Sequence, residues 1–230
     1  MALDDTAVAT QRRILAAAAE CIARDGLAQV RMATIAKAAG VSTALLHYHF
    51  ATKERLFAEV LTYSYDASSV LDQDALSSAG KTPAERLAAY LDRCLPIDEA
   101  LIHDWLLWQE LALLCLRDPD LAGIGVDLYE RMYQTVAQII NDGITAGEFA
   151  DCDAHDVAVT ALALTDGLGT RVLAHDPQVD LDGARRIVAT TVGELIGFAG
   201  PLPMPGVRRP RRSHTAVKRS SVRRGVGESA

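Results

Sequence analysis

Residues 42–53 hold side chains whose types suit contact with nucleic acid. The run reads STALLHYHFATK, so two imidazoles, a phenol and an ammonium group lie close together in the chain. Such groups can donate hydrogen bonds to phosphate oxygens, which position a protein on DNA without reading its sequence. The same run could form the exposed face of an ordinary helical hairpin, and its spacing alone leaves both interpretations open.

The residues around this run predict two short helices joined by a tight turn. Four apolar residues recur at the spacing of one helix face, namely Met32, Ile35, Ala36 and Ala39. Gly40 can adopt the positive φ that ends a helix, and Ser42 or Thr43 can cap the next one. Thr52 marks a further helix start. This arrangement is typical of a helix-turn-helix, whose second helix presents its first residues to base edges.

The stretch from Arg12 to Leu61 resembles the N-terminal domain of the TetR family of bacterial transcriptional repressors. Its central pattern is IAxxAGVSxxxLxxHFxxK, which runs from Ile35 to Lys53. Further matching residues are Ile14, Leu15, Ala18, Gly26, Tyr48, Leu56 and Phe57. The resemblance implies an all-α chain, in which an N-terminal three-helix helix-turn-helix DNA-binding domain precedes a larger C-terminal helical ligand-binding and dimerisation domain.

The spacing and the resemblance together indicate which residues touch DNA. Base or groove contacts are expected from the start of the second helix, and phosphate contacts from its end and from the next helix start. The predicted DNA-binding residues are Arg31, Ser42, Thr43, Ala44, Leu45, His47, Tyr48, His49 and Lys53. Arg31 stands near the position where the family usually has a capping Thr, so it either contacts phosphate or is only solvated.

Charge is distributed unevenly along the chain, whose formal net charge is −7. Residues 10–55 carry seven Lys or Arg against three Asp or Glu, whereas residues 56–200 carry eight against twenty-four. DNA should therefore meet the N-terminal part, because its phosphates repel an acidic body. Residues 201–230 carry eight cations against one anion, and their repulsion together with four prolines predicts disorder. This tail either serves solubility alone or adds non-specific DNA contact at low salt.

We divide the chain into a DNA-binding domain at 1–53, a helical ligand-binding and dimerisation domain at 54–200, and a disordered basic tail at 201–230. A long connecting helix is expected from Thr52 to about Ser77. Start and stop signals predict further helices at about 83–95, 98–116, 120–145, 154–174 and 181–199.

The helix at 154–174 carries two apolar stripes, one beginning at Val157 and the other at Ala158. Because one subunit offers this helix a single core, the second stripe is expected to face another copy of the chain. The last two helices of each subunit would then form a four-helix bundle in a homodimer, as the family resemblance also implies. A two-fold dimer suits a palindromic operator.

The helical body is expected to hold a small-molecule effector, which in the family changes the spacing of the DNA-binding units. The candidate ligand-binding residues are Tyr90, His103, Trp105, Trp108, Glu110, Tyr129, Tyr133 and Asp166. Aromatic rings with nearby carboxylates could hold a cationic or amine ligand, and the Leu-rich helices suit a long apolar ligand equally well. Each of these aromatic residues could instead belong to the core.

Other function classes find little support in the sequence. It contains no P-loop, no GxGxxG after a strand, no HExxH and no GxSxG, so we expect no enzyme and no cofactor. The four cysteines form no CxxC and are expected to pack as small apolar residues rather than bind metal. With no apolar span or signal peptide, no membrane association and a cytoplasmic location are expected. The chain is thus predicted to be a ligand-responsive, homodimeric transcriptional repressor, with an effector-independent architectural DNA-binding protein as the alternative.

Overall fold

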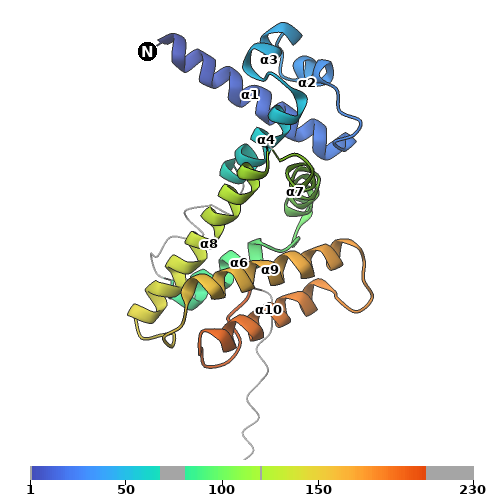
Figure 1. Cartoon of the computed structure of the whole chain (residues 1–230). Helices are drawn as coiled ribbons and strands as arrows, with labels where there is room; N and C mark the ends of the chain where they lie inside the picture. The colour runs from blue at the N-terminus through green and yellow to red at the C-terminus, as the bar shows by residue number, and fades with distance from the viewer. Residues whose placement is uncertain (1, 68–80, 120, 206–230) are drawn as a thin grey trace, which may run out of the picture.

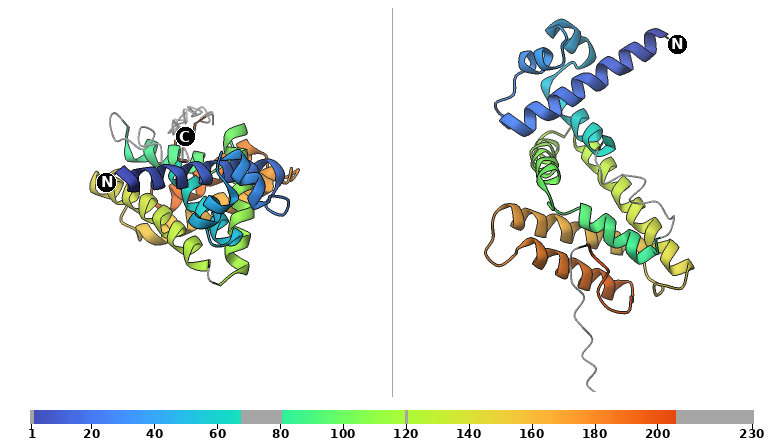
Figure 2. Two further views of the ribbon diagram at one scale, coloured as in Figure 1. Left: turned by 90° about the horizontal axis from the view of Figure 1, so that it is seen from above. Right: turned by 180° about the vertical axis from the view of Figure 1, so that it is seen from behind.

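The computed structural model describes residues 2–67, 81–119 and 121–205, and these residues form helices and connecting loops without a strand. The molecule is elongated, with a small helical unit at one end and a pair of antiparallel helices at the other (Figures 1 and 2). This architecture confirms the expected all-α fold.

The N-terminal unit consists of three helices packed on the start of a fourth. Their bounds are Ala2–Asp25 for α1, Met32–Ala38 for α2, Thr43–His49 for α3 and Lys53–Ala67 for α4. Apolar residues at helical spacing meet in one small core, and those with no exposed surface are Ile14, Ala18, Ile35, Leu46, Phe50 and Leu56. Because α4 shares this core and continues into the body, it joins the two parts of the molecule.

Residues 81–119 and 121–205 of the body contain five further helices. Their bounds are Pro83–Arg93 for α6, Glu99–Arg117 for α7, Ala122–Thr145 for α8, Ala154–Leu173 for α9 and Leu181–Leu195 for α10. The predicted start signal at Thr82 is confirmed, since Thr82 and Glu85 form a reciprocal capping box with Pro83 in the first turn. Asp98, Asp153 and Asp180 cap α7, α9 and α10 in a similar way. Helices α9 and α10 lie side by side, remote from α1–α3 (Figure 2).

The expectation that one stripe of α9 needs a partner subunit is wrong. Val157, Ala161 and Leu168 of the first stripe are buried, and so are Ala158 and Leu162 of the second. One subunit can cover both because α9 packs against α6, α8 and α10, and the Trp105 ring of α7 lies against it. The exposed face of α9 is instead a third stripe, composed of Thr160, Ala163, Gly167 and Thr170.

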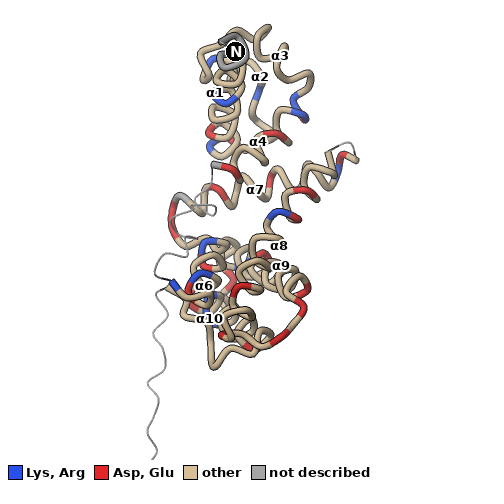
Figure 3. The backbone as a smooth tube through the Cα atoms, turned by 90° about the vertical axis from the view of Figure 1, so that its left-hand side faces the viewer, with Lys and Arg blue, Asp and Glu red and all other residues tan. Residues whose placement is uncertain are grey.

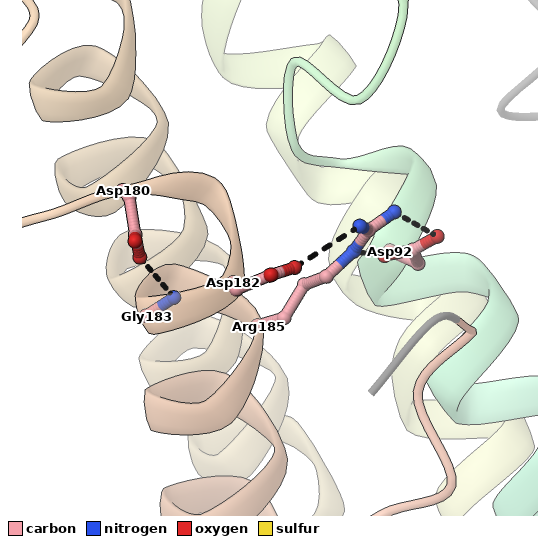
Figure 4. A network of polar contacts seen from close by, with 5 residues as sticks. All are labelled: Asp92, Asp180, Asp182, Gly183 and Arg185. Carbon is pink, nitrogen blue, oxygen red and sulfur yellow. Dashed lines mark hydrogen bonds and ion pairs between the residues drawn. The ribbon is translucent and has the colours of Figure 1, made fainter. Parts of the chain in front are cut away.

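Helix α10 is tied to α6 by a buried ion pair, drawn in Figure 4. The Arg185 guanidinium donates to both carboxylate oxygens of Asp92, with Nε–Oδ1 and Nη2–Oδ2 distances of 2.7 and 3.3 Å. The Asp92 side chain is only 5% exposed and that of Arg185 is 14% exposed. A bidentate pair of this kind fixes the orientation of both helices. Asp182 lies at the outer edge of the same guanidinium, 3.8 Å away.

The chain departs from the predicted boundaries after α10. This helix ends at Leu195 rather than near Ala199, because Gly197 adopts a φ of +62° and Phe198 donates its N–H back to the Gly193 carbonyl. Leu202 and Met204 are buried, and the Leu202 N–H donates to the Ala189 carbonyl over 3.0 Å. Residues 201–205 therefore pack on α10 instead of starting a disordered tail. The remaining tail, 206–230, and the predicted helical segment 68–77 lie outside the described residues.

Candidate nucleic-acid interface and effector pocket

Helix α3 is positioned by its own sequence. The Ser42 hydroxyl accepts the Leu45 N–H over 3.1 Å, which decides between the two predicted caps in favour of Ser42 over Thr43. Gly40 turns the chain at a φ of +64°, and the Val41 N–H donates to the Ala36 carbonyl. Leu46 and Phe50 are fully buried. These contacts fix which face of α3 points outward.

The outward face holds the predicted DNA-binding residues of α3. Thr43, Ala44, Leu45, His47 and Tyr48 are exposed, and His49 is half-buried. Tyr48 is 82% exposed, which is unusual for a tyrosine and leaves its hydroxyl available to a partner. Its ring lies edge-on to that of His49, with centroids 5.4 Å apart. The structure thus brings these side chains together on one surface.

Two cations flank this surface. Arg31 is the N-cap of α2 and makes no side-chain capping bond, as expected from the missing Thr, and it is exposed. Lys53 begins α4 and is half-buried, with its Nζ 3.4 Å from the Leu27 carbonyl oxygen and 5.1 Å from the centroid of the Phe57 ring. The ammonium group is therefore held in place by the fold. Figure 3 shows the Lys and Arg of the N-terminal helices and the many Asp and Glu of the body.

A cavity opens in the body among α4, α6, α7, α8 and α9. It has an empty volume of about 660 Å³, part of it open to solvent. Four of the predicted ligand-binding residues line it, namely Trp105, Trp108, Tyr129 and Asp166. The other lining residues were not singled out from the sequence: Tyr65, Arg93, Cys94, Leu101, Asp104, Gln109, Ala112 and Met132.

Two carboxylates, those of Asp104 and Asp166, line this cavity together with one guanidinium, that of Arg93. Asp166 accepts a hydrogen bond of 3.0 Å from the Tyr129 hydroxyl. Burial raises the pKa of the Asp166 carboxyl, and the bond from Tyr129 offsets part of that rise. Burial likewise raises the pKa of Asp104. A bound cation would stabilise the ionised form of either carboxyl.

The aromatic walls of the cavity are fixed by close packing. The Trp105 ring lies against Gly169 of α9, where an added Cβ would come within 2.4 Å of the ring. The Trp108 ring meets that of Tyr65 edge to face, with centroids 6.0 Å apart. Gly169 therefore leaves room for an indole to turn into the cavity, and no helical pattern in the sequence indicates this.

The other four predicted ligand-binding residues lie elsewhere. His103 and Glu110 are exposed on α7, because they occupy the helix face opposite the cavity. Glu110 contacts the N-terminal unit, where its Oε2 accepts the Leu27 N–H over 3.3 Å. Tyr90 is fully buried in the core and does not line the cavity. Tyr133 stacks on Tyr129 with ring centroids 6.0 Å apart, one layer away from the cavity.

Two models of known protein families match this chain, one in the N-terminal unit and one in the body. Residues 14–60 match the family model described as bacterial regulatory proteins, tetR family. Residues 83–197 match the model described as BetI-type transcriptional repressor, C-terminal. The chain belongs to the TetR family of transcriptional regulators. The TetR helix-turn-helix therefore corresponds to α2 and α3, and the BetI-type model covers the helices that line most of the cavity.

Individual TetR relatives span most of the chain. The HTH-type transcriptional regulator BetI of Rhizobium meliloti strain 1021 is 27% identical over 203 residues, which are 86% of this chain and 95% of the relative. A transcriptional regulator of Saccharomonospora viridis, solved in complex with choline, is 32% identical with a TM-score of 0.66, covering 77% of this chain and 92% of its own. A TetR-family regulator from Rhodococcus sp. is 25% identical with a TM-score of 0.71. The match covers 82% of this chain and 99% of the Rhodococcus chain.

Among residues 2–67, 81–119 and 121–205, no three His, Cys, Asp or Glu side chains are grouped so as to hold a metal ion. Cys21, Cys94 and Cys115 are buried as free thiols, in agreement with the packing role expected of them. Within the same part of the chain, no helix is both long and apolar enough to cross a membrane.

Proposed function

We propose that this TetR-family regulator is a homodimeric repressor of a palindromic DNA operator, released when a small quaternary ammonium ligand such as choline binds in the body. The DNA contacts are assigned to the exposed face of α3 with Arg31 and Lys53, and the effector to the cavity beside Trp105, Trp108 and Asp166. Domain limits of 1–53 for DNA binding and 54–200 for effector binding and dimerisation follow from this assignment, as does action in the cytoplasm.

The proposal for the effector rests on the side chains that line the cavity. Three aromatic residues, Trp105, Trp108 and Tyr129, line the same space as the carboxylates of Asp104 and Asp166. A quaternary ammonium ion binds well between aromatic faces, and a desolvated contact of this kind contributes about 2 kcal/mol. The choline complex of the Saccharomonospora viridis relative supports the same ligand class. A long apolar ligand suits the cavity less, because it would bury two carboxylates with only the Arg93 guanidinium to balance their charges.

The exposed faces of α9 and α10 support the proposed dimer. The stripe Thr160, Ala163, Gly167 and Thr170 is made of small side chains that permit close helix approach. On α10, Ile187 and Leu195 are 41% and 42% exposed. These faces replace the buried stripes as the surface on which a second subunit would pack. A two-fold dimer would place its two α3 helices on successive half-sites of the operator.

The proposal is tested by selecting DNA duplexes from a random pool with the full-length protein, then titrating choline against the selected duplex. We expect an enriched palindrome and a DNA affinity that falls with choline, because a ligand acts by its differential affinity for the two states. If the protein bound an enriched palindrome with an affinity that choline did not change, the assignment of the effector would be wrong. Salt-sensitive binding without enrichment would favour the architectural alternative.

A further inference from the structure

We infer that Glu110 is a positioning residue, which ties the effector cavity to the DNA-binding unit through the backbone of Leu27. The inference rests on the proposed function and names a physical connection between its two sites. Glu110 was expected to face a ligand, yet it lies on the opposite side of α7 and touches the loop between α1 and α2.

The backbone of Leu27 is held from both sides by charged groups. Its N–H donates to the Glu110 carboxylate over 3.3 Å, and its carbonyl accepts from the Lys53 ammonium over 3.4 Å. The Glu110 carboxylate also lies beside Gly26, where an added Cβ would be 3.9 Å from Oε1. Leu27 thus connects a residue of the body with the lysine to which we assign a phosphate contact.

The position of Glu110 on α7 links this contact to the cavity. Trp105, Trp108, Gln109 and Ala112 of the same helix line the cavity. Helix α7 also packs against α1, α4 and α8, and Figure 2 shows it between the N-terminal unit and the α9–α10 pair. A ligand that shifts the backbone of α7 at Trp108 or Gln109 would also shift Glu110, the next residue.

A second connection runs through α4, and the two connections meet at Lys53. Tyr65 lines the cavity near the end of α4, and Lys53 is the first residue of that helix. The bond from Glu110 adds a direct connection from α7 to the α1–α2 loop, which α4 contacts separately through Lys53. Removing the Glu110 acceptor should therefore weaken communication between the sites while leaving each site intact.

The test compares the wild type with Glu110→Leu, Glu110→Gln and the control Glu99→Leu, which removes another exposed carboxylate from α7. For each protein, operator affinity is measured without choline and at saturating choline, and choline affinity is measured without DNA. We expect the ratio of the two operator affinities to fall about tenfold in Glu110→Leu, the size of a charge-assisted hydrogen bond. Glu110→Gln should restore most of the ratio because its amide oxygen can accept the same bond.

Choline affinity without DNA should stay within about twofold of wild type in every variant, because Glu110 does not line the cavity. A wild-type ratio in Glu110→Leu would overturn the inference. So would a Glu110→Gln protein no better than Glu110→Leu, since the contact would then not act as a hydrogen bond.

A second measurement separates this inference from the choice of effector. Hydrogen exchange of the Leu27 amide should be about tenfold faster in Glu110→Leu than in Glu99→Leu. A double-mutant cycle of Glu110→Leu with Lys53→Met on operator affinity should be non-additive, because both side chains hold the same residue. If choline has no effect on the wild type, the proposed effector is wrong, while additive effects and unchanged exchange would overturn the role of Glu110.

Discussion

Polar side chains are exposed on α3 of the DNA-binding unit, whereas in the body several are buried and paired. At α3, Thr43, His47 and Tyr48 stand on the surface of a small apolar core and make no contribution to it. In the body, Asp92 and Asp166 are withdrawn from solvent and paired with Arg185 and Tyr129. An exposed contact residue can be changed at little cost in stability, whereas a buried polar group couples function to folding and to pH.

The largest expected effect is on folding. Asp92→Ala leaves the largely buried Arg185 guanidinium with only the exposed Asp182 carboxylate 3.8 Å away, which should lower the free energy of unfolding by about 3 kcal/mol. Asp66→Ala is the matched control, because it breaks an ion pair with Arg131 whose side chains are 53% and 45% exposed, and it should cost less than about 1 kcal/mol. Urea denaturation at one protein concentration measures both. Equal losses would contradict the contrast between buried and exposed polar contacts.

The next effect is on the effector. Asp166→Asn removes the charge but keeps an oxygen that can accept the Tyr129 bond, so choline affinity should fall about 10–100-fold. Operator affinity without choline should stay unchanged, because Asp166 lies in the body. Asp156→Asn, an exposed change on the same helix, is the control. Calorimetric titration with choline gives the affinities, and an equal loss in the control would show that overall charge, rather than the cavity, attracts the ligand.

The pH dependence of choline binding also tests the role of the Asp166 carboxylate. The pKa of Asp166 is raised by burial, and a bound cation favours the ionised carboxylate. Choline affinity should therefore be constant above that raised pKa and fall, by at most about tenfold per pH unit, as the pH drops through it. The fall should be smaller in the Asp166→Asn protein, in which Asp104 is the remaining cavity carboxylate with a raised pKa. Choline affinity that rises on acidification would contradict the assignment.

Changes at the DNA-binding end should alter recognition, and those at the exposed residues Thr43 and Tyr48 should leave stability unchanged. Lys53→Ala and Tyr48→Phe should each weaken binding to all DNA sequences by about 0.5–1.5 kcal/mol, because each removes a phosphate contact. Thr43→Ala should instead change which sequence is preferred. Binding to a panel of operator variants separates the two outcomes. A uniform loss for Thr43→Ala would mean that the groove-reading residues are misplaced. Thermal unfolding checks that the stability of the Thr43→Ala and Tyr48→Phe proteins is unchanged.

The smallest expected effect concerns the two histidines of α3. An imidazole N–H can donate to a phosphate oxygen, so replacing both His47 and His49 by Ala should weaken operator binding by less than about 1 kcal/mol. Titration of the operator with both proteins at one pH and one salt concentration measures the change. A double variant that binds as tightly as the wild type would exclude a phosphate contact from either ring.

Local sequence signals predicted the elements well wherever a few neighbouring residues control the outcome. Caps such as Thr82 with Glu85 and Asp153 act within one helical turn, and both are formed. The break at Gly40 and the outward face of α3 depend on equally short spacings. The end of α10 was placed too late, because the turn at Gly197 is stabilised by a bond to Gly193 that its glycine alone does not make evident.

The candidate effector site was predicted less well, because it depends on packing between distant segments. Trp105 enters the cavity since Gly169, far along the chain, leaves space for its ring. Asp104 and Tyr65 are cavity residues because of how α7 and α4 cross the other helices, and nothing in their immediate sequence distinguishes them. The argument from two apolar stripes on α9 failed for the same reason, since it assumed fewer neighbours than the fold supplies.

The sequence by itself determined the helical class, the helix-turn-helix and the residues that face outward from α3, because hydrogen bonds and apolar spacing within a few turns decide them. Only the tertiary structure decided which side chains share the cavity, which stripes of α9 remain exposed, and that Glu110 reaches Leu27. These outcomes depend on the rotation and crossing of whole helices, which many weak packing contacts set together.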